Sequence, residues 1–161
     1  MSELVPKSDL VPGAPVPHFD LAADGGRWVQ LTDFAGQKVV LYFYPKDDTS
    51  GCTKEAEGFS AAAAAFAEAG CVVIGVSKDS VSSHDRFKAK YALNLILASD
   101  PEGAVVEAYG AWVEKSMYGR KYMGIDRSTF LIDGQGRLVQ AWRKVKVPGH
   151  VEAVLKGVQT L

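Results

Sequence analysis

Residues 39–55 read Val-Val-Leu-Tyr-Phe-Tyr-Pro-Lys-Asp-Asp-Thr-Ser-Gly-Cys-Thr-Lys-Glu, and they carry the strongest structural signal in the chain. An apolar, β-favouring run, Val39–Tyr44, is followed by a run of turn-forming residues, Pro45–Gly51. Cys52 comes next and opens a strongly helical pattern. The stretch therefore predicts a buried strand, a loop, and a helix that carries a cysteine in its first turn.

The predicted position of Cys52 favours the ionised form of its thiol. The N–H groups of a first helical turn lack intrahelical partners, and the helix dipole places roughly +0.5 charge at that end. Helix N-termini are among the sites that stabilise a thiolate, which is the nucleophilic form of cysteine. We therefore expect Cys52 to be a reactive cysteine.

The spacing Pro45-x-x-x-Thr49-x-x-Cys52 resembles the active-site signature of the peroxiredoxins. The longer string Tyr-Phe-Tyr-Pro-Lys-Asp-Asp-Thr-Ser-Gly-Cys-Thr-Lys-Glu-Ala is similar to the bacterioferritin-comigratory-protein branch, also called PrxQ. That branch often has proline where this chain has Ser50, a departure that we expect to alter loop stiffness more than chemistry. The resemblance covers nearly the whole chain, from about Val16 to the C-terminus.

The resemblance implies a thiol-dependent peroxidase that reduces hydrogen peroxide and organic hydroperoxides. Cys52 would attack a peroxide oxygen as the peroxidatic nucleophile and become a cysteine sulfenic acid. The Thr49 hydroxyl would hydrogen-bond the peroxide, and the amides of Gly51 and Cys52 can face the same space. Pro45, which has no N–H to donate, would shield the sulfur from water.

A cation for this site is expected from the string Asp126-Arg127-Ser128-Thr129-Phe130-Leu131-Ile132-Asp133. It resembles the peroxiredoxin motif in which an arginine just before a late strand reaches the active thiolate. A guanidinium offers a fixed charge and a fork of donors. Glu55, one turn into the helix, is expected to orient Arg127, although a carboxylate there could simply favour the helix dipole.

The order of elements predicts an α/β domain. An extended arm over 1–15 precedes a hairpin near 18–21 and 28–31. Further strands are expected at 38–44, 71–77, 93–98, 128–132 and 137–142, and helices at 52–70, 80–91, 102–109 and 151–158. Residues 112–124 are read as a loop plus an edge strand. This is a thioredoxin-like fold with an added N-terminal β-hairpin of the peroxiredoxin type, and we expect a single domain over 1–161.

Composition limits the partners and the compartment. A formal net charge of −1 does not favour a nucleic-acid or acidic-membrane partner, and no apolar run approaches the roughly 18 residues of a membrane span. The N-terminus lacks the apolar core of a signal peptide, and two cysteines do not form a disulfide framework, which favours the cytoplasm.

The three histidines show no metal spacing, so we expect surface or capping histidines and neither a metal nor a cofactor. We expect a monomer, with a dimer as the alternative.

The chain departs from many peroxiredoxins in lacking an evident resolving cysteine. The position five residues after Cys52 is Glu57, and the helix expected at 80–91 has no cysteine. Cys71 is the other thiol of the chain, and a helix of about 18 residues, or roughly 27 Å, separates it from Cys52. A disulfide needs Cα atoms within about 7 Å. We therefore expect Cys71 to be a buried apolar residue, and a one-cysteine enzyme recycled by thioredoxin, glutaredoxin or glutathione.

Two other functions stay open from the sequence. A thiol–disulfide oxidoreductase could use the same fold, but Cys52 is followed by Thr53, Lys54 and Glu55 rather than by the Cys-x-x-Cys pattern. A non-enzymatic chaperone-like module could also keep the fold. The joint presence of Pro45, Thr49, Cys52 and Arg127 favours the peroxidase over both.

Overall fold

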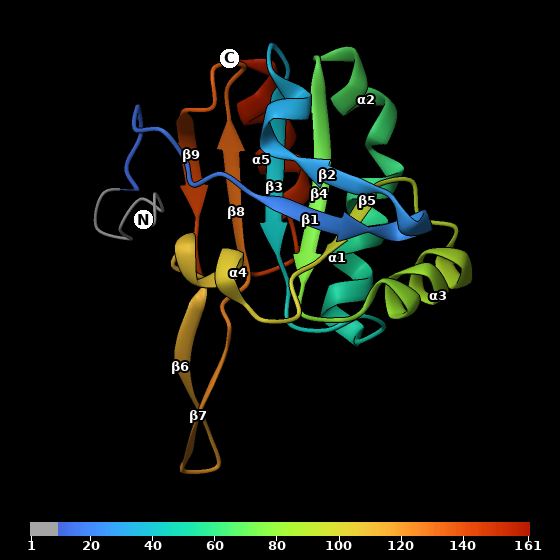
Figure 1. Ribbon diagram of the computed structural model, residues 1–161, viewed down its shortest axis with the longest axis vertical. Helices are drawn as coiled ribbons and strands as arrows, with labels where there is room; N and C mark the ends of the chain where they lie inside the picture. The colour runs from blue at the N-terminus through green and yellow to red at the C-terminus, as the bar shows by residue number, and fades with distance from the viewer. Residues whose placement is uncertain (1–9) are drawn as a thin grey trace.

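The computed structural model describes residues 10–161, and its centre is a seven-stranded mixed sheet (Figure 1). The strands are β1 (Asp20–Ala23), β2 (Trp28–Gln30), β3 (Lys38–Phe43), β4 (Cys71–Ser77), β5 (Ile96–Ser99), β8 (Ser128–Ile132) and β9 (Leu138–Trp142). Their spatial order is β2-β1-β5-β4-β3-β8-β9. Strands β3, β4 and β5 are parallel, whereas β1, β8 and β9 pair with their neighbours in the antiparallel sense. Residues 1–9 of the predicted arm lie outside the described residues.

Strand β3 lies in the interior of the sheet, between β4 and β8, as its continuous apolar run predicts. Its side chains alternate between two buried clusters. Val39, Leu41 and Phe43 pack on one face of the sheet, and Val40 and Tyr42 pack on the other. Because both faces are covered, the loop that leaves the C-terminal end of β3 starts from a fixed point of the core.

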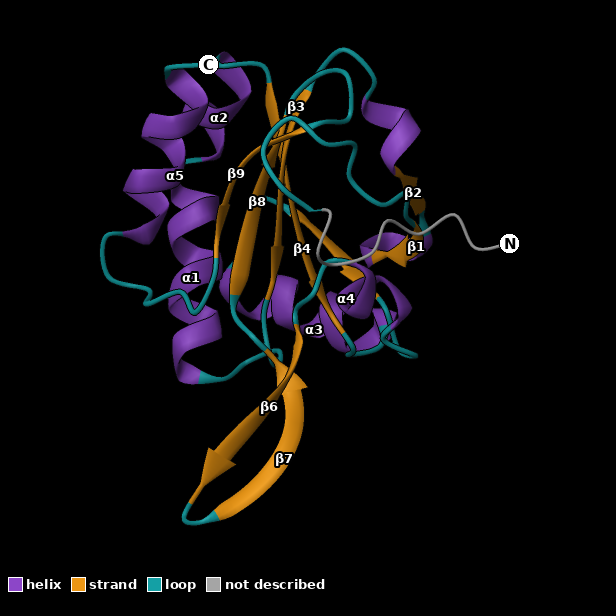
Figure 2. Ribbon diagram, turned by 90° about the vertical axis from the view of Figure 1, so that its left-hand side faces the viewer, coloured by secondary structure: helices purple, strands orange, loops and turns teal. Residues whose placement is uncertain are grey.

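The helices are α1 (Ser50–Ala61), α2 (Ala63–Glu68), α3 (Val81–Tyr91), α4 (Ala104–Ala108) and α5 (His150–Gln159), with short 3-10 turns η2 (Asp24–Gly26) and η3 (Leu31–Phe34). Helices α1, α2 and α5 cover one face of the sheet, and the hairpin β1–β2 and α4 lie on the other (Figure 2). Helix α3 packs against β1, β5 and η2. The helix expected over 52–70 is thus two helices with a break at Ala62, which no residue of the surrounding alanine run predicts.

The segment read as a loop plus an edge strand is instead a separate hairpin, and that prediction was wrong. Strands β6 (Trp112–Met117) and β7 (Arg120–Ile125) pair with each other and project from the body (Figure 1). The cause is the two-residue turn between them: Tyr118 and Gly119 have φ values of 54° and 79°. Positive φ at both central positions is typical of the tight hairpin turn that joins consecutive antiparallel strands.

The predicted α/β class is confirmed, including the added N-terminal hairpin, which β1 attaches to the sheet through β5. The strand β3, the helices α1 and α2, and the parallel strand β4 form the first crossover, and β8, β9 and α5 complete the thioredoxin-like order. Within residues 10–161, no helix combines the length and the apolar character needed to cross a membrane.

Candidate active site

Cys52 lies in the first turn of α1, at the end of the loop that leaves β3. The helix begins at Ser50, and its first helical hydrogen bond runs from the Thr53 amide to the Thr49 carbonyl at 2.8 Å. The amides of residues 50–52 therefore precede the first intrahelical bond. Only 2% of Cys52 is exposed, because the rest of its surface is part of the core cluster under α1. The strand, loop and helix predicted from residues 39–55 are confirmed.

The structure brings Arg127, Cys52 and Glu55 together although Arg127 is distant in sequence. Arg127 follows β7 and donates from Nη2 to the Cys52 sulfur at 3.4 Å and from Nη1 to Glu55 Oε1 at 2.7 Å. Glu55 is wholly buried, and its second oxygen has no hydrogen-bond partner among residues 10–161. One guanidinium thus bridges the sulfur and a buried carboxylate, so its position is fixed by both.

Burial and neighbouring charges shift the pKa values of Glu55 and Arg127 in opposite directions. Burial raises the pKa of Glu55 to about 7, although Arg127 acts in the opposite direction. Burial would lower the pKa of Arg127, but the charges of Glu55 and Cys52 outweigh it and hold that pKa above its ordinary value. Arg127 is therefore a permanent cation beside the sulfur.

The other predicted site residues flank Cys52. Pro45 and Thr49 are exposed on the loop side of α1. Thr49 occupies the N-cap position without a capping bond from its side chain; its hydroxyl instead donates to the Lys46 carbonyl at 2.8 Å. That donation uses the proton of the hydroxyl and leaves its lone pairs as acceptors. The Thr49 hydroxyl can therefore still accept a hydrogen bond from an O–H group.

Gly51 lies directly against the guanidinium. A Cβ atom built on Gly51 would be 3.2 Å from Arg127 Nη2 and 3.8 Å from Cζ. That space is tighter than ordinary van der Waals contact, so a methyl group there would push the guanidinium away from its present position.

We expect Gly51→Ala to slow the reaction of Cys52 with peroxide while leaving the protein at least as stable. Alanine gains up to about 1 kcal/mol over glycine in a helix, whereas moving a catalytic group by as little as about 1 Å can cost up to about 100-fold in rate. Stopped-flow oxidation rates and urea unfolding check the two parts. An unchanged oxidation rate would mean that the position of the guanidinium is not critical.

Cys71 and Cys52 lie at opposite ends of the parallel strands β3 and β4. Cys71 begins β4, where it pairs with Lys38 at the start of β3, whereas Cys52 follows the loop after the far end of β3 (Figure 1). Cys71 is 6% exposed, and burial raises the pKa of its thiol to about 12. Both cysteines are free thiols. At neutral pH Cys71 is therefore protonated and a poor nucleophile.

Two of the three histidines, His84 and His150, are buried, contrary to the prediction from the sequence. His18 is exposed, but His84 in α3 and His150 at the start of α5 are buried, so the expectation of surface or capping residues was wrong for both. Burial lowers the pKa of His150 to about 4, and Arg127 acts in the same direction. The spacing of His84, Phe87 and Tyr91 on one face of α3 was the available signal. Among residues 10–161, no three His, Cys, Asp or Glu side chains gather to hold a metal ion.

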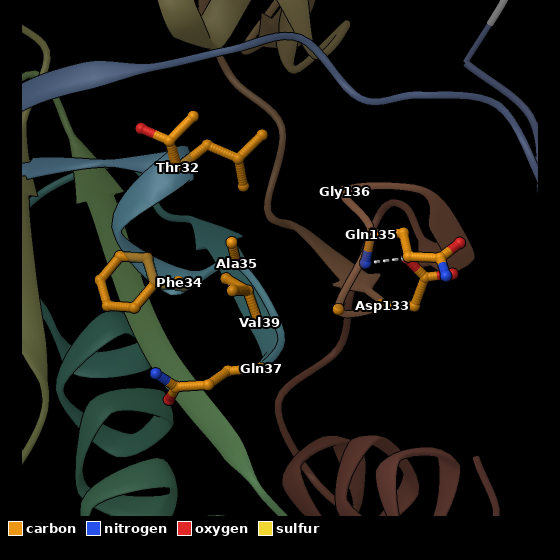
Figure 3. Close-up of a pocket in the computed structure, with 10 residues that line it drawn as sticks. Thr32, Phe34, Ala35, Gln37, Val39, Asp133, Gln135 and Gly136 are labelled. Carbon is orange, nitrogen blue, oxygen red and sulfur yellow. Dashed lines mark hydrogen bonds between the residues drawn. The ribbon is translucent and has the colours of Figure 1, made fainter.

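A cavity of about 290 Å³ lies away from Cys52, between η3 and the turn that joins β8 and β9 (Figure 3). One polar group of its lining, the Asp133 carboxylate, is already used in the turn. Asp133 accepts hydrogen bonds from the amides of Gln135 and Arg137 at 2.9 and 3.0 Å. The carboxylate that borders this cavity therefore stabilises the hairpin turn, and the reactive groups of the chain lie elsewhere.

Comparison with known proteins places these residues in a family context. The AhpC/TSA family matches residues 12–141. The chain is 52% identical over 143 residues to a putative peroxiredoxin bcp of Coxiella burnetii, covering 89% of this chain and 95% of the relative. It is 47% identical over 149 residues to peroxiredoxin Bcp of Bacillus subtilis, covering 92% and 95%. A solved structure of the Xanthomonas campestris bacterioferritin comigratory protein, described in connection with alkyl peroxide reduction, aligns with a TM-score of 0.85 and 46% identity, covering 88% of this chain and 90% of that chain.

Proposed function

Because the chain belongs to the AhpC/TSA family and is a peroxiredoxin of the Bcp/PrxQ group, we propose that Cys52 is its peroxidatic nucleophile in a one-cysteine cycle. The enzyme is a thiol-dependent peroxidase, as its relatives are. The observation that carries the assignment to Cys52 is the 3.4 Å contact between its sulfur and Arg127, at a helix N-terminus. A fixed cation and a helix dipole both favour a thiolate at that point.

In the proposed reaction the Cys52 thiolate attacks one oxygen of the peroxide. A sulfur–oxygen bond forms as the oxygen–oxygen bond breaks, so the sulfur is oxidised to a sulfenic acid and the peroxide is reduced. The leaving hydroxide or alkoxide takes up a proton and departs as water or an alcohol. Arg127 and the first amides of α1 stabilise the negative charge that moves from sulfur to the leaving oxygen.

Hydrogen peroxide and organic hydroperoxides are the proposed substrates. Both carry the O–H group that the free lone pairs of Thr49 can accept. The related Xanthomonas campestris protein is described in connection with alkyl peroxide reduction, which supports the organic class. Pro45 and Thr49 are exposed in the loop that leads to the buried Cys52, and Pro45 is proposed to shield the sulfur from water.

Reduction of the sulfenic acid is assigned to an outside thiol. The first thiol displaces water and forms a mixed disulfide with Cys52, and a second thiol releases Cys52 and leaves as the disulfide of the reductant. Cys71 is a buried and protonated thiol at the other end of the parallel strands. Thioredoxin, glutaredoxin and glutathione are the candidate reductants.

The intact mass of the protein tests this cycle. One equivalent of peroxide should give the mass of the monomer plus one oxygen, and a small thiol should convert this species to a mixed disulfide. Cys71→Ser should keep turnover with an outside thiol near that of wild type, because its sulfur takes no part. A mass two hydrogens below that of the reduced protein, with the two cysteines joined in one peptide pair, would overturn the one-cysteine cycle.

The remaining proposals concern the protein as a whole. We propose one domain over residues 1–161, which the length of the chain favours, and a monomeric state. We also propose the cytoplasm as its compartment, which the low cysteine count favours. The peroxidase names of its relatives argue against a thiol–disulfide oxidoreductase or a non-enzymatic chaperone-like module.

A further inference from the structure

Helix α3 holds the loop that connects β3 to the Cys52 helix. The first attachment point is Asp47, which is 7% exposed. Its carboxylate accepts hydrogen bonds from Tyr44 at 2.6 Å, from Ser83 at 2.8 Å and from His84 Nδ1 at 2.7 Å. Its own amide donates to Asp79, just before α3, at 2.8 Å. Three of these four contacts come from α3 or from the residues that lead into it.

Buried contacts of His84 join Asp47 to β5. His84 is wholly buried; Nδ1 lies 2.7 Å from Asp47 Oδ2, and Nε2 lies 2.9 Å from the Ala98 carbonyl. Burial alone would raise the pKa of Asp47, but the hydrogen bonds from His84, Tyr44 and Ser83 outweigh it and lower that pKa. These hydrogen bonds inside the core thus fix Asp47 to α3 and, through His84, to β5.

Asp48 is the second attachment point, on the surface. Its φ value of 59° lies in the left-handed region, which residues other than glycine seldom adopt. Its carboxylate accepts from Lys90 Nζ at 2.8 Å and from the Tyr91 hydroxyl at 2.6 Å, both at the C-terminal end of α3. Two hydrogen bonds therefore hold the backbone in a conformation that it would not favour by itself.

We infer that α3 positions the peroxide-binding loop: His84 acts through Asp47, and Lys90 and Tyr91 act through Asp48, to hold Thr49 at the N-cap of the Cys52 helix. We call these three residues of α3 and the two aspartates the α3 clamp. They touch neither peroxide nor sulfur and are positioning residues. The inference rests on the proposed role of Cys52 as the peroxidatic nucleophile.

The clamp acts on the peroxide side of the site and not on the thiolate. Thr49 directly follows Asp48, and its hydroxyl is tied to the Lys46 carbonyl, directly before Asp47. The hydroxyl therefore moves with the two aspartates. Arg127 is held separately, by Glu55. A loosened clamp should impair reaction with peroxide, which needs Thr49, and spare reaction with an electrophile that needs the thiolate alone.

The test compares two second-order rate constants of Cys52 in the full chain: oxidation by hydrogen peroxide and alkylation by iodoacetamide. The first variant is Asp48→Gly. Glycine adopts the left-handed backbone without strain, and the change removes the hydrogen bonds from Lys90 and Tyr91. The others are Tyr91→Phe with Lys90→Met in one chain, and His84→Gln. Each should lower the ratio of oxidation to alkylation, by roughly 10-fold and at most about the 100-fold that a 1 Å misplacement can cost.

The matched control is Lys88→Met, on the same helix. The Lys88 side chain donates to Asp24 at 2.7 Å and not to either aspartate of the clamp, so this variant weakens the attachment of α3 on its other side. Its ratio should equal that of wild type even if its melting temperature falls. An unchanged ratio in Asp48→Gly and in the Lys90 and Tyr91 variant, or an equal fall in Lys88→Met, would overturn the inference. If wild-type Cys52 is alkylated but not oxidised by peroxide, the proposed function itself fails.

Discussion

Cys52→Ser is expected to abolish peroxidase turnover and to leave the fold intact. A serine hydroxyl stays protonated at neutral pH and is a poor nucleophile without a general base beside it, and here the neighbour of the sulfur is a cation. Serine replaces cysteine with little change of volume, so the core around α1 should keep its packing. Peroxide consumption with an excess of thiol gives the rate, and circular dichroism checks the fold.

The matched control for this variant is Cys71→Ser, which removes the other thiol of the chain. It should retain turnover, with a modest loss of stability because a hydroxyl then occupies an apolar site. The rate measured without protein is subtracted as background. If Cys52→Ser then keeps more than about a few per cent of wild-type turnover, the chemistry takes place at a different residue.

Arg127→Ala is expected to slow the oxidation of Cys52 by roughly 10- to 1,000-fold, the scale of losing one charged donor to the transition state. The variant removes the cation at 3.4 Å from the sulfur and also leaves Glu55 without its partner. Breaking a buried ion pair from one side costs about 3–5 kcal/mol where the remaining charge stays ionised. Stopped-flow oxidation rates should therefore be measured together with urea unfolding.

Two further variants separate catalysis from stability. Arg127→Lys keeps the charge but not the fork that reaches sulfur and carboxylate together, so its oxidation rate should lie between those of wild type and alanine. Arg143→Ala removes an arginine that donates to the carbonyls of Tyr109 and Gly110 and has no bond to Cys52, so its oxidation rate should stay near that of wild type. Equal losses in Arg127→Ala and Arg143→Ala would assign the effect to stability.

Local patterns determined most of the architecture. The apolar run before Pro45 had to be buried on both faces, and the turn formers after it had to carry the chain to a helix, so the position of Cys52 in the first turn followed from adjacent residues. The hairpin β6–β7 was missed because its turn, Tyr118–Gly119, depends on a non-glycine residue with positive φ. The sequence pattern does not indicate such a residue.

The chemical environment of Cys52 was decided by contacts between residues far apart in the chain. The resemblance suggested that Arg127 would reach the sulfur, but only the packing of β8 beside β3 places it 3.4 Å away and buries Glu55 to hold it. His84 is clearer still: its spacing with Phe87 and Tyr91 indicates a buried face of the helix, but nothing local indicates that it contacts Asp47 inside the core. Sequence periodicity reports which face of an element is apolar, whereas a buried polar contact depends on which elements the sheet brings together.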